Sequence, residues 1–141
     1  MAPHHDSAEL LRSSGRRVTQ ARLTVMSILR MSGSHMTPSE VIGRVEGTDV
    51  HVNQSTIYRA LSDLRDAGLV SESRFGSGEA SYEWILDQNH HHVHCTGCGE
   101  TVELDEKPVR RFLSDVARES GFVPDTKHLV ITGLCRRCQA N

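Results

Sequence analysis

The chain has 141 residues, of which 37% are hydrophobic, 24% charged and 4% aromatic, and its formal net charge is -2. This length suits one ordinary domain or two small ones, and it excludes large catalytic barrels and most doubly wound dinucleotide folds. The near-neutral charge argues against a protein that coats nucleic acid along its whole surface, whereas a basic patch on one face is compatible with DNA binding. No apolar run approaches the roughly 18 residues of a membrane-spanning helix, and the N-terminus lacks the apolar segment of a secretory signal. We therefore expect a cytoplasmic protein without a membrane span.

Residues 1–86 are predicted to form a helical domain that ends in a hairpin. After a loose tail over 1–7, apolar residues recur at helical spacing in one short and three longer segments. Each longer segment has a typical N-capping residue at or near its start and a glycine at or near its end. The predicted helices are 8–13, 18–31, 37–47 and 53–67, and two strands at 69–75 and 80–86 flank a Gly-Ser turn. Three helices followed by a hairpin are the layout of a winged-helix domain.

Residues 87–141 are predicted to form a small α/β module. The predicted elements are strands at 91–95, 101–105 and 128–134, and a helix at 108–119. A module of about 50 residues buries little apolar surface, so we expect a structural metal and dimerisation to stabilise it. The expected fold class of the whole chain is α+β.

The four cysteines form two Cys-x-x-Cys pairs, Cys95 with Cys98 and Cys135 with Cys138. Disulfides are rare in a reducing compartment, whereas four thiolates complete a tetrahedral zinc site. Such a site leaves no open coordination position, so we expect structural rather than catalytic Zn²⁺. The alternative interpretation is a pair of redox dithiols or disulfides.

The polar face of the predicted helix 53–67 is the candidate DNA-reading surface. Its side chains near the N-terminal end, where groove and phosphate contacts occur, are Ser55, Thr56, Tyr58 and Arg59. Arg17, just before the first long helix, adds a second basic position. One winged helix makes few phosphate contacts, so specific binding predicts a two-fold homodimer on a palindromic double-stranded operator. Protein binding by this face is the alternative.

Four histidines lie within five positions, His90, His91, His92 and His94. In an extended segment alternate residues share a face, so His90 and His92 point the same way and form a natural metal pair. The carboxylates of Glu83 and Glu103, and the imidazole of His35 from the first domain, would complete the shell. Such a nitrogen and oxygen shell suits Fe²⁺, Mn²⁺, Zn²⁺, Co²⁺ or Ni²⁺.

These segments, in their order and spacing, resemble the ferric uptake regulator family of metal-responsive transcription regulators. The matching pieces are RVTQAR at 17–22, HMTPSEV at 35–41, STIYRAL at 55–61, DAGLV at 66–70, YE at 82–83, NHHHVHCTGC at 89–98 and GLCRRC at 133–138. The resemblance implies a winged-helix DNA-binding domain over 1–86, a hinge, and a dimerisation domain over 87–141 with a structural zinc held by the four cysteines.

The resemblance also implies a regulatory ion at the hinge, Fe²⁺, Mn²⁺, Zn²⁺ or Ni²⁺, held by His35, Glu83, His90, His92 and Glu103. It assigns DNA contacts to Arg17, Tyr58 and Arg59. Some members have a further metal site, whose positions fall here on Asn89, His91 and Lys127, with His128 one place away. These residue types predict that the further site is absent or altered.

Together these features predict a metal-dependent repressor that is not an enzyme. A peroxide-sensing member of the family is one alternative, although Glu103 stands where peroxide sensors typically have Asp. A zinc-stabilised protein-interaction adaptor is another. A zinc hydrolase is disfavoured, because the sequence lacks HExxH and has few aromatic residues.

Overall fold

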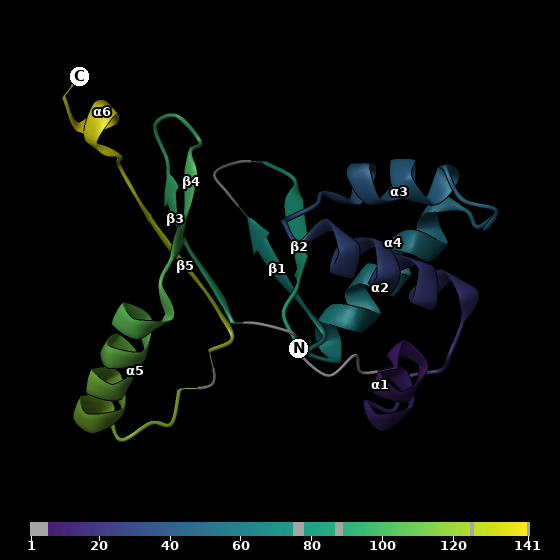
Figure 1. The fold of residues 1–141 in the computed structure, drawn as a ribbon, viewed down its shortest axis with the longest axis horizontal. Helices are drawn as coiled ribbons and strands as arrows, with labels where there is room; N and C mark the ends of the chain where they lie inside the picture. The colour runs from purple at the N-terminus through teal and green to yellow at the C-terminus, as the bar shows by residue number, and fades with distance from the viewer. Residues whose placement is uncertain (1–5, 75–77, 87–88, 125, 141) are drawn as a thin grey trace. The chain divides into compact units, whose positions relative to one another are not determined.

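In the computed structural model the chain divides into two compact units, Met1–Asp87 and Gln88–Asn141, which are treated separately below (Figure 1). The structure describes residues 6–74, 78–86, 89–124 and 126–140. Most of the predicted tail, part of the hairpin turn and the predicted domain boundary at 86–87 involve positions outside these ranges. Within the described ranges, no helix is long and apolar enough to cross a membrane.

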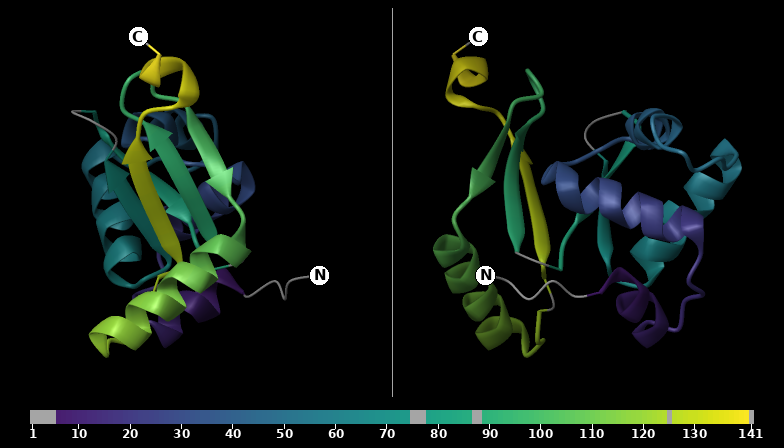
Figure 2. Two further views of the ribbon diagram at one scale, coloured as in Figure 1. Left: turned by 90° about the vertical axis from the view of Figure 1, so that its left-hand side faces the viewer. Right: turned by 45° about the vertical axis from the view of Figure 1, so that its right-hand side comes forward.

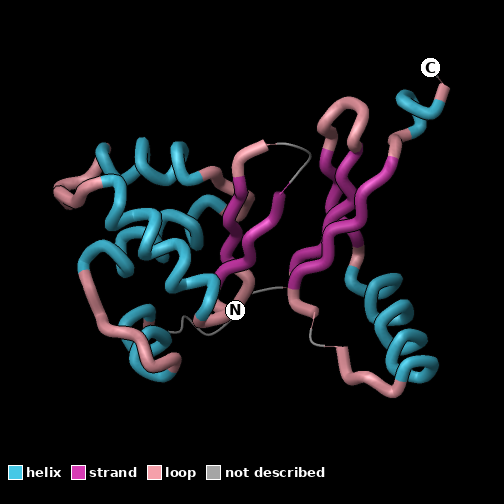
Figure 3. The backbone as a smooth tube through the Cα atoms, turned by 180° about the vertical axis from the view of Figure 1, so that it is seen from behind, coloured by secondary structure: helices cyan, strands magenta, loops and turns pink. Residues whose placement is uncertain are grey.

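Four helices form most of the first unit and appear in cyan in Figure 3: α1 (Ser7–Ser13), α2 (Gln20–Ser32), α3 (Pro38–Glu46) and α4 (Gln54–Asp66). The predicted caps are confirmed. Thr19 accepts a hydrogen bond from the Arg22 amide at the start of α2, and Asn53 accepts one from the Thr56 amide at the start of α4. A full capping box begins α3. Because caps satisfy amides that lack partners inside the helix, these helix starts are set locally.

The apolar stripes of the helices meet in a single core. Fully buried side chains on α2, α3 and α4 include Val25, Leu29, Val41, Leu61 and Leu64. Burying each such side chain stabilises the fold by about 1.5–3 kcal/mol, so this contact holds the three helices together. The remaining face of α4 stays polar and exposed.

A hairpin of β1 (Val70–Arg74) and β2 (Ala80–Trp84) closes the first unit. The two strands are antiparallel, with Val70 opposite Trp84. Met36, in the segment before α3, also pairs with Tyr82 through two backbone hydrogen bonds of 2.9 and 2.8 Å. Helices plus a hairpin wing with this extra bridge confirm the predicted winged-helix fold.

The second unit is a three-stranded sheet with one long helix (Figure 2). The central strand β3 (His90–Cys95) pairs antiparallel with β4 (Thr101–Leu104) and parallel with β5 (His128–Gly133). The connection from β4 to β5 contains α5 (Glu106–Ser120). The predicted α/β module is confirmed, and the predicted helix at 108–119 begins two residues earlier.

A short helix, α6 (Arg136–Gln139), was not predicted. It is a single turn that follows Cys135 and contains Cys138, and the Gln139 amide donates to the Cys135 carbonyl at 3.0 Å. Four residues are too few to show a helical period, so the sequence pattern carries no signal for it.

Candidate metal and DNA-binding sites

The four cysteine sulfurs converge at one end of the β3–β5 pair, and all lie within 4.8 Å of one another. None of the four forms a disulfide. The sulfurs of Cys98 and Cys135 are 3.8 Å apart. A tetrahedron with Zn–S bonds of about 2.3 Å has sulfurs separated by about 3.8 Å, so the spacing of this pair suits a zinc ion.

The pKa values of two of the thiols also favour a metal site. Backbone N–H groups, that of Cys135 first and that of Cys98 next, lower the pKa of Cys95 to about 6. The neighbouring sulfurs, that of Cys135 first, raise the pKa of Cys138 to about 12. The amides therefore stabilise the Cys95 thiolate, while hydrogen bonds with the neighbouring sulfurs favour the protonated form of Cys138. A divalent cation at the centre would replace these hydrogen bonds with metal–sulfur bonds and offset the charge of the thiolates, so the cluster fits a metal.

In the first unit, His35 and Glu83 form a pair of candidate ligands. His35 Nε2 lies 3.2 Å from Glu83 Oε2. The antiparallel bridge between Met36 and Tyr82 explains this contact. In an antiparallel pair the residue before Met36 lies next to the residue after Tyr82, and these residues are His35 and Glu83. The backbone therefore places an imidazole beside a buried carboxylate.

In the second unit, His90, His92 and Glu103 form a second group. The rings of His90 and His92 lie parallel with centroids 6.4 Å apart, which confirms the predicted shared face. Glu103 on β4 lies opposite His92 in the strand register, and its Oε1 is 3.6 Å from His90 Nδ1. The five predicted ligands thus form two groups, one in each unit.

The candidate DNA-reading face is the exposed side of α4. Tyr58 is 45% exposed and Arg59 is also exposed, whereas Ile57 and Leu61 on the opposite side are buried. The hydroxyls of Ser55 and Thr56 donate to Asn53 Oδ1 at 2.8 and 2.7 Å. They therefore order the N-terminal turn of the helix that carries Tyr58 and Arg59.

A surface hollow of the first unit brings Arg17 together with this face. Its lining includes Arg17 from the segment before α2, and Thr56 and Arg59 from α4. Asp63, also on α4, forms an ion pair with Arg22 of α2 and lies 3.9 Å from Arg16. Two cations thus compensate this acidic group at the basic surface.

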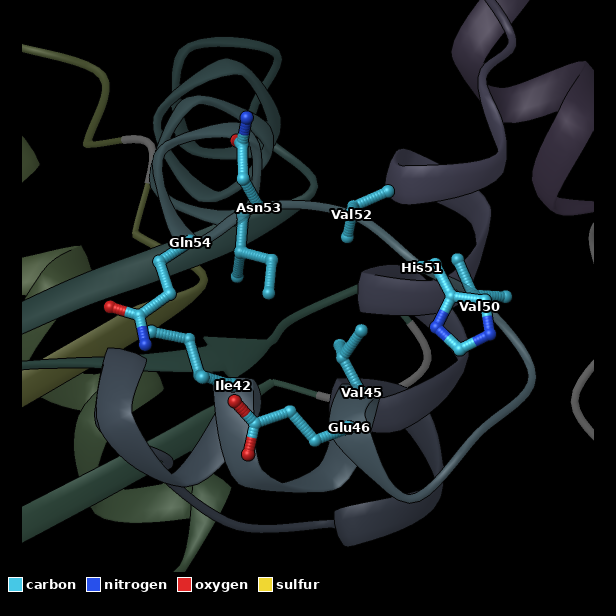
Figure 4. Close-up of a pocket in the computed structure, with 9 residues that line it drawn as sticks. Ile42, Val45, Glu46, Val50, His51, Val52, Asn53 and Gln54 are labelled. Carbon is cyan, nitrogen blue, oxygen red and sulfur yellow. The ribbon is translucent and has the colours of Figure 1, made fainter.

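Another hollow lies between α3 and the start of α4, and it is lined by polar and apolar groups in similar measure (Figure 4). Ile42, Val45, Val50 and Val52 contribute carbon to its wall, and Glu46 lies at its edge. The hollow follows the loop between the two helices, and His51, Asn53 and Gln54 supply polar groups to its wall. We assign it no ligand.

Comparison with known proteins identifies the family. A family model described as ferric uptake regulator family matches residues 13–132. The chain belongs to the ferric uptake regulator family. The ferric uptake regulation protein of Bordetella parapertussis is 30% identical over 135 residues, covering 95% of this chain and 96% of that protein. The peroxide operon regulator of Bacillus subtilis is 27% identical over 140 residues, covering 98% and 96%.

A solved structure of the ferric uptake regulator from Pseudomonas aeruginosa with manganese superposes with a TM-score of 0.81. It is 26% identical, and the match covers 94% of this chain and 99% of that one. The ferric uptake regulator family consists of metal-responsive transcriptional regulators that bind DNA and form dimers, rather than enzymes. The chain is therefore a metal-responsive regulator of transcription.

At two of the positions where the resemblance would place a further metal site, His91 and Asn89 contact groups of the second unit. His91 Nδ1 accepts from the Leu129 amide at 3.1 Å, and His91 Nε2 lies 3.2 Å from Glu106 Oε2. The amide donor requires a lone pair on Nδ1, so Nε2 carries the proton toward the carboxylate. Asn89 Nδ2 donates to the same carboxyl group at 3.4 Å. Both ring nitrogens are engaged by protein groups, which favours a structural role for His91.

Two features were missed by sequence reasoning. Glu106 as the partner of His91, and His128 beside His92, both depend on contacts between distant segments. The available signal for His128 was its position as the first residue of the predicted strand 128–134.

Proposed function

We propose that this protein is a metal-dependent repressor, in which a divalent ion bound by both domains favours the DNA-binding arrangement of a homodimer. The observation that carries the proposal is the pair of preformed ligand groups. His35 and Glu83 are placed together by the wing, and His90, His92 and Glu103 by the second sheet. The first group has only two ligands, so it cannot enclose an ion without donors from the second unit.

One ion bound by all five side chains would link the winged helix to the dimerisation domain. The imidazoles supply neutral nitrogen donors, and the two carboxylates offset the charge of the cation. Restricting the angle between the domains sets the distance between the two recognition helices of a dimer, which must match successive major grooves. Ion and operator then strengthen each other's binding, typically by about 1–3 kcal/mol.

The proposed regulatory ion is Fe²⁺, Mn²⁺, Zn²⁺ or Ni²⁺. This range follows from a shell of nitrogen and oxygen without thiolate. The manganese named for the Pseudomonas aeruginosa structure supports a site of this kind in the family.

At the second metal site we propose a structural Zn²⁺ bound by the four cysteines. Replacing Cys95 with Ser removes a thiol whose ionisation the backbone amides favour. The expected result is loss of bound zinc with unfolding of the second unit or dissociation of the dimer, because binding of a structural metal contributes to folding. A stable dimer without zinc would contradict this role.

The proposed DNA contacts are Arg17, Ser55, Thr56, Tyr58 and Arg59, on a palindromic double-stranded operator. Arg59 and Arg17 line one hollow and would contact phosphates or base edges, while Tyr58 is exposed beside them. Ser55 and Thr56 order the helix end whose dipole favours phosphate. Action on DNA supports the proposed cytoplasmic location, and the proposed function involves no enzymatic role.

The apolar surface of the second unit supports the proposed homodimer. Val102, Phe112 and Ile131 are 55, 53 and 45% exposed. On α5, only Val109 is buried, although the helix is amphipathic. Apolar residues at this density on one small unit mark a surface for protein contact, and a second copy of the chain is the partner that a palindromic operator requires.

Gel-shift measurements on the DNA upstream of the protein's own gene test the function. Binding by the wild-type protein is expected to depend on added metal, and His92→Ala is expected to abolish that dependence while leaving a folded dimer with zinc at the cysteines. His51→Ala is the matched control, since His51 is exposed in the first unit. Metal-dependent binding by His92→Ala would contradict the assignment.

Peroxide sensing is a second candidate, favoured by the likeness to the peroxide operon regulator. It would use the same site, although Glu103 stands where peroxide sensors typically have Asp, and oxidation would fall on the imidazoles next to bound iron. Mass spectrometry after treatment with iron and peroxide separates the two functions, because only a peroxide sensor gains oxygen on His35 or His90. An adaptor without DNA binding would fail the gel shift with every metal.

A further inference from the structure

His128 adds a third imidazole to the face of the sheet that carries His90 and His92. In the parallel pairing of β3 with β5, His128 lies opposite His90. Its ring centroid is 5.2 Å from that of His92, and the two planes meet at 56°. Three imidazoles from two adjacent strands therefore gather within one small sheet, and Glu103 flanks β3 on the other side.

The register of β5 decides which face receives this imidazole. Residues paired in a parallel ladder share a face, so His128 is on the side of His90 and His92. A shift of one residue would transfer it to the opposite face, which carries His91. His91 is already engaged by the Leu129 amide and by Glu106, so the two faces have different chemistry.

The geometry of the two rings suits shared coordination. His92 and His128 are inclined rather than stacked, so a nitrogen of each can point toward a common centre. Both rings belong to strands of the same rigid sheet, which reduces the conformational entropy lost when an ion is bound. The structure thus brings a neutral nitrogen donor to a group that already contains two.

We propose that His128 is a further ligand of the regulatory ion. This inference rests on the proposed function, because it assumes that His90 and His92 bind that ion. With His35, the shell would contain four imidazoles, a donor set that favours Zn²⁺, Ni²⁺ or Co²⁺ over the carboxylate-preferring Mn²⁺. His128 would thereby influence which metal activates the protein.

Proton NMR of the Co²⁺-loaded dimer, with zinc at the cysteines, tests the proposal without a substitution. Each coordinated imidazole gives a strongly shifted, exchangeable ring N–H resonance. The proposal predicts four such resonances, from His35, His90, His92 and His128. Three resonances, with none from His128, would overturn it.

Single-residue variants assign the resonances and distinguish a failure of the His128 proposal from a failure of the regulatory site. His128→Ala is expected to lose one shifted resonance and to weaken Co²⁺ binding at least about tenfold. Loss of a residue that only hydrogen-bonds to a metal ligand already weakens binding by about 10–100-fold, so loss of a ligand should cost at least the lower value. Mn²⁺ binding should weaken less. His51→Ala is the control and should match the wild type.

If His92→Ala loses a resonance and weakens Co²⁺ binding while His128→Ala behaves like the control, the inference about His128 is wrong and the regulatory site stands. If neither His90→Ala nor His92→Ala changes the spectrum, the proposed regulatory site itself is wrong. Zinc content and circular dichroism of each variant verify that the second unit remains folded.

Discussion

Gly97 shows how one residue governs the cysteine cluster. It lies between Cys95 and Cys98, and a Cβ at this position would stand 2.9 Å from the Cys138 sulfur and 3.0 Å from the Cys138 Cβ. Real Cβ atoms almost never approach another atom this closely, so the first pair of cysteines closes over the second only when no side chain intervenes. The metal site therefore needs a glycine here for reasons of space.

We predict that Gly97→Ala destabilises the zinc-loaded protein by about 1–3 kcal/mol, the usual range for overpacking, and weakens zinc binding. Thermal unfolding and competition with a zinc chelator measure the two effects. Gly133→Ala is the control, because a Cβ there would meet nothing within 4 Å. Equal losses in both variants would show that space beside Cys138 is not the cause.

The histidines show how far residue patterns reach. The shared face of His90 and His92 follows from the two-residue period of a strand and was predictable. The position of His128 depends on which strand pairs with β3 and in which register, over a separation of more than 30 residues. Local sequence patterns do not predict which strands pair, so only the structure shows that His128 lies beside His92.

At the scale of elements, Glu72 connects the recognition helix to the wing. Its carboxylate on β1 forms an ion pair with Arg65 of α4 and accepts a hydrogen bond from the Tyr82 hydroxyl of β2 at 3.2 Å. The hydrogen bond from Arg65, followed by that from Tyr82, lowers the pKa of Glu72 below its ordinary value of 4.5, against the opposing effect of burial. The charged form is thus favoured in the folded protein.

The stability that Glu72 contributes should depend on pH. A carboxyl group with a lowered pKa stabilises the fold fully above its unfolded pKa, and that contribution disappears as the pH falls through the folded value. Glu72→Gln should therefore lower the melting temperature at pH 7 and have a smaller effect at about pH 3.

Calorimetry at both pH values checks this prediction. Glu79→Gln serves as the control, because Glu79 is exposed and contacts only the Ser39 hydroxyl among the described residues. An effect of Glu72→Gln that stays constant with pH would mean that its charge does not hold the wing to α4.

Elements with local signals were the predictable part of the fold. The caps at Thr19, Thr37 and Asn53 mark the starts of α2, α3 and α4, because a cap involves residues only a few positions apart. The bridge from Met36 to Tyr82 joins single residues far apart in the chain, and it has no such mark. The bridge brings His35 and Glu83 together. The sequence therefore predicted these two residues as ligands, but it did not predict the backbone contact that places them side by side.

At the scale of the whole molecule, the dimer determines whether two recognition helices act together. Phe112→Glu would place a charge on the exposed apolar side of α5, and we predict that it weakens the dimer by about 2 kcal/mol or more, roughly thirtyfold in Kd. Sedimentation equilibrium measures the effect. Val123→Glu is the control, because Val123 is 93% exposed in the segment after the helix. A dimer that survives Phe112→Glu would place the interface elsewhere.

In the proposed mechanism, the regulatory ion and the operator both bind preferentially to the same conformation of the dimer. Thermodynamic linkage then requires each ligand to tighten the other by an equal factor, about 5–150-fold for typical coupled sites. Both halves can be measured on one zinc-loaded dimer, by titrating Co²⁺ with and without operator and operator with and without Co²⁺. The account predicts equal factors in the wild-type protein and none in His92→Ala. An affinity for Co²⁺ that is unchanged by the operator would contradict it.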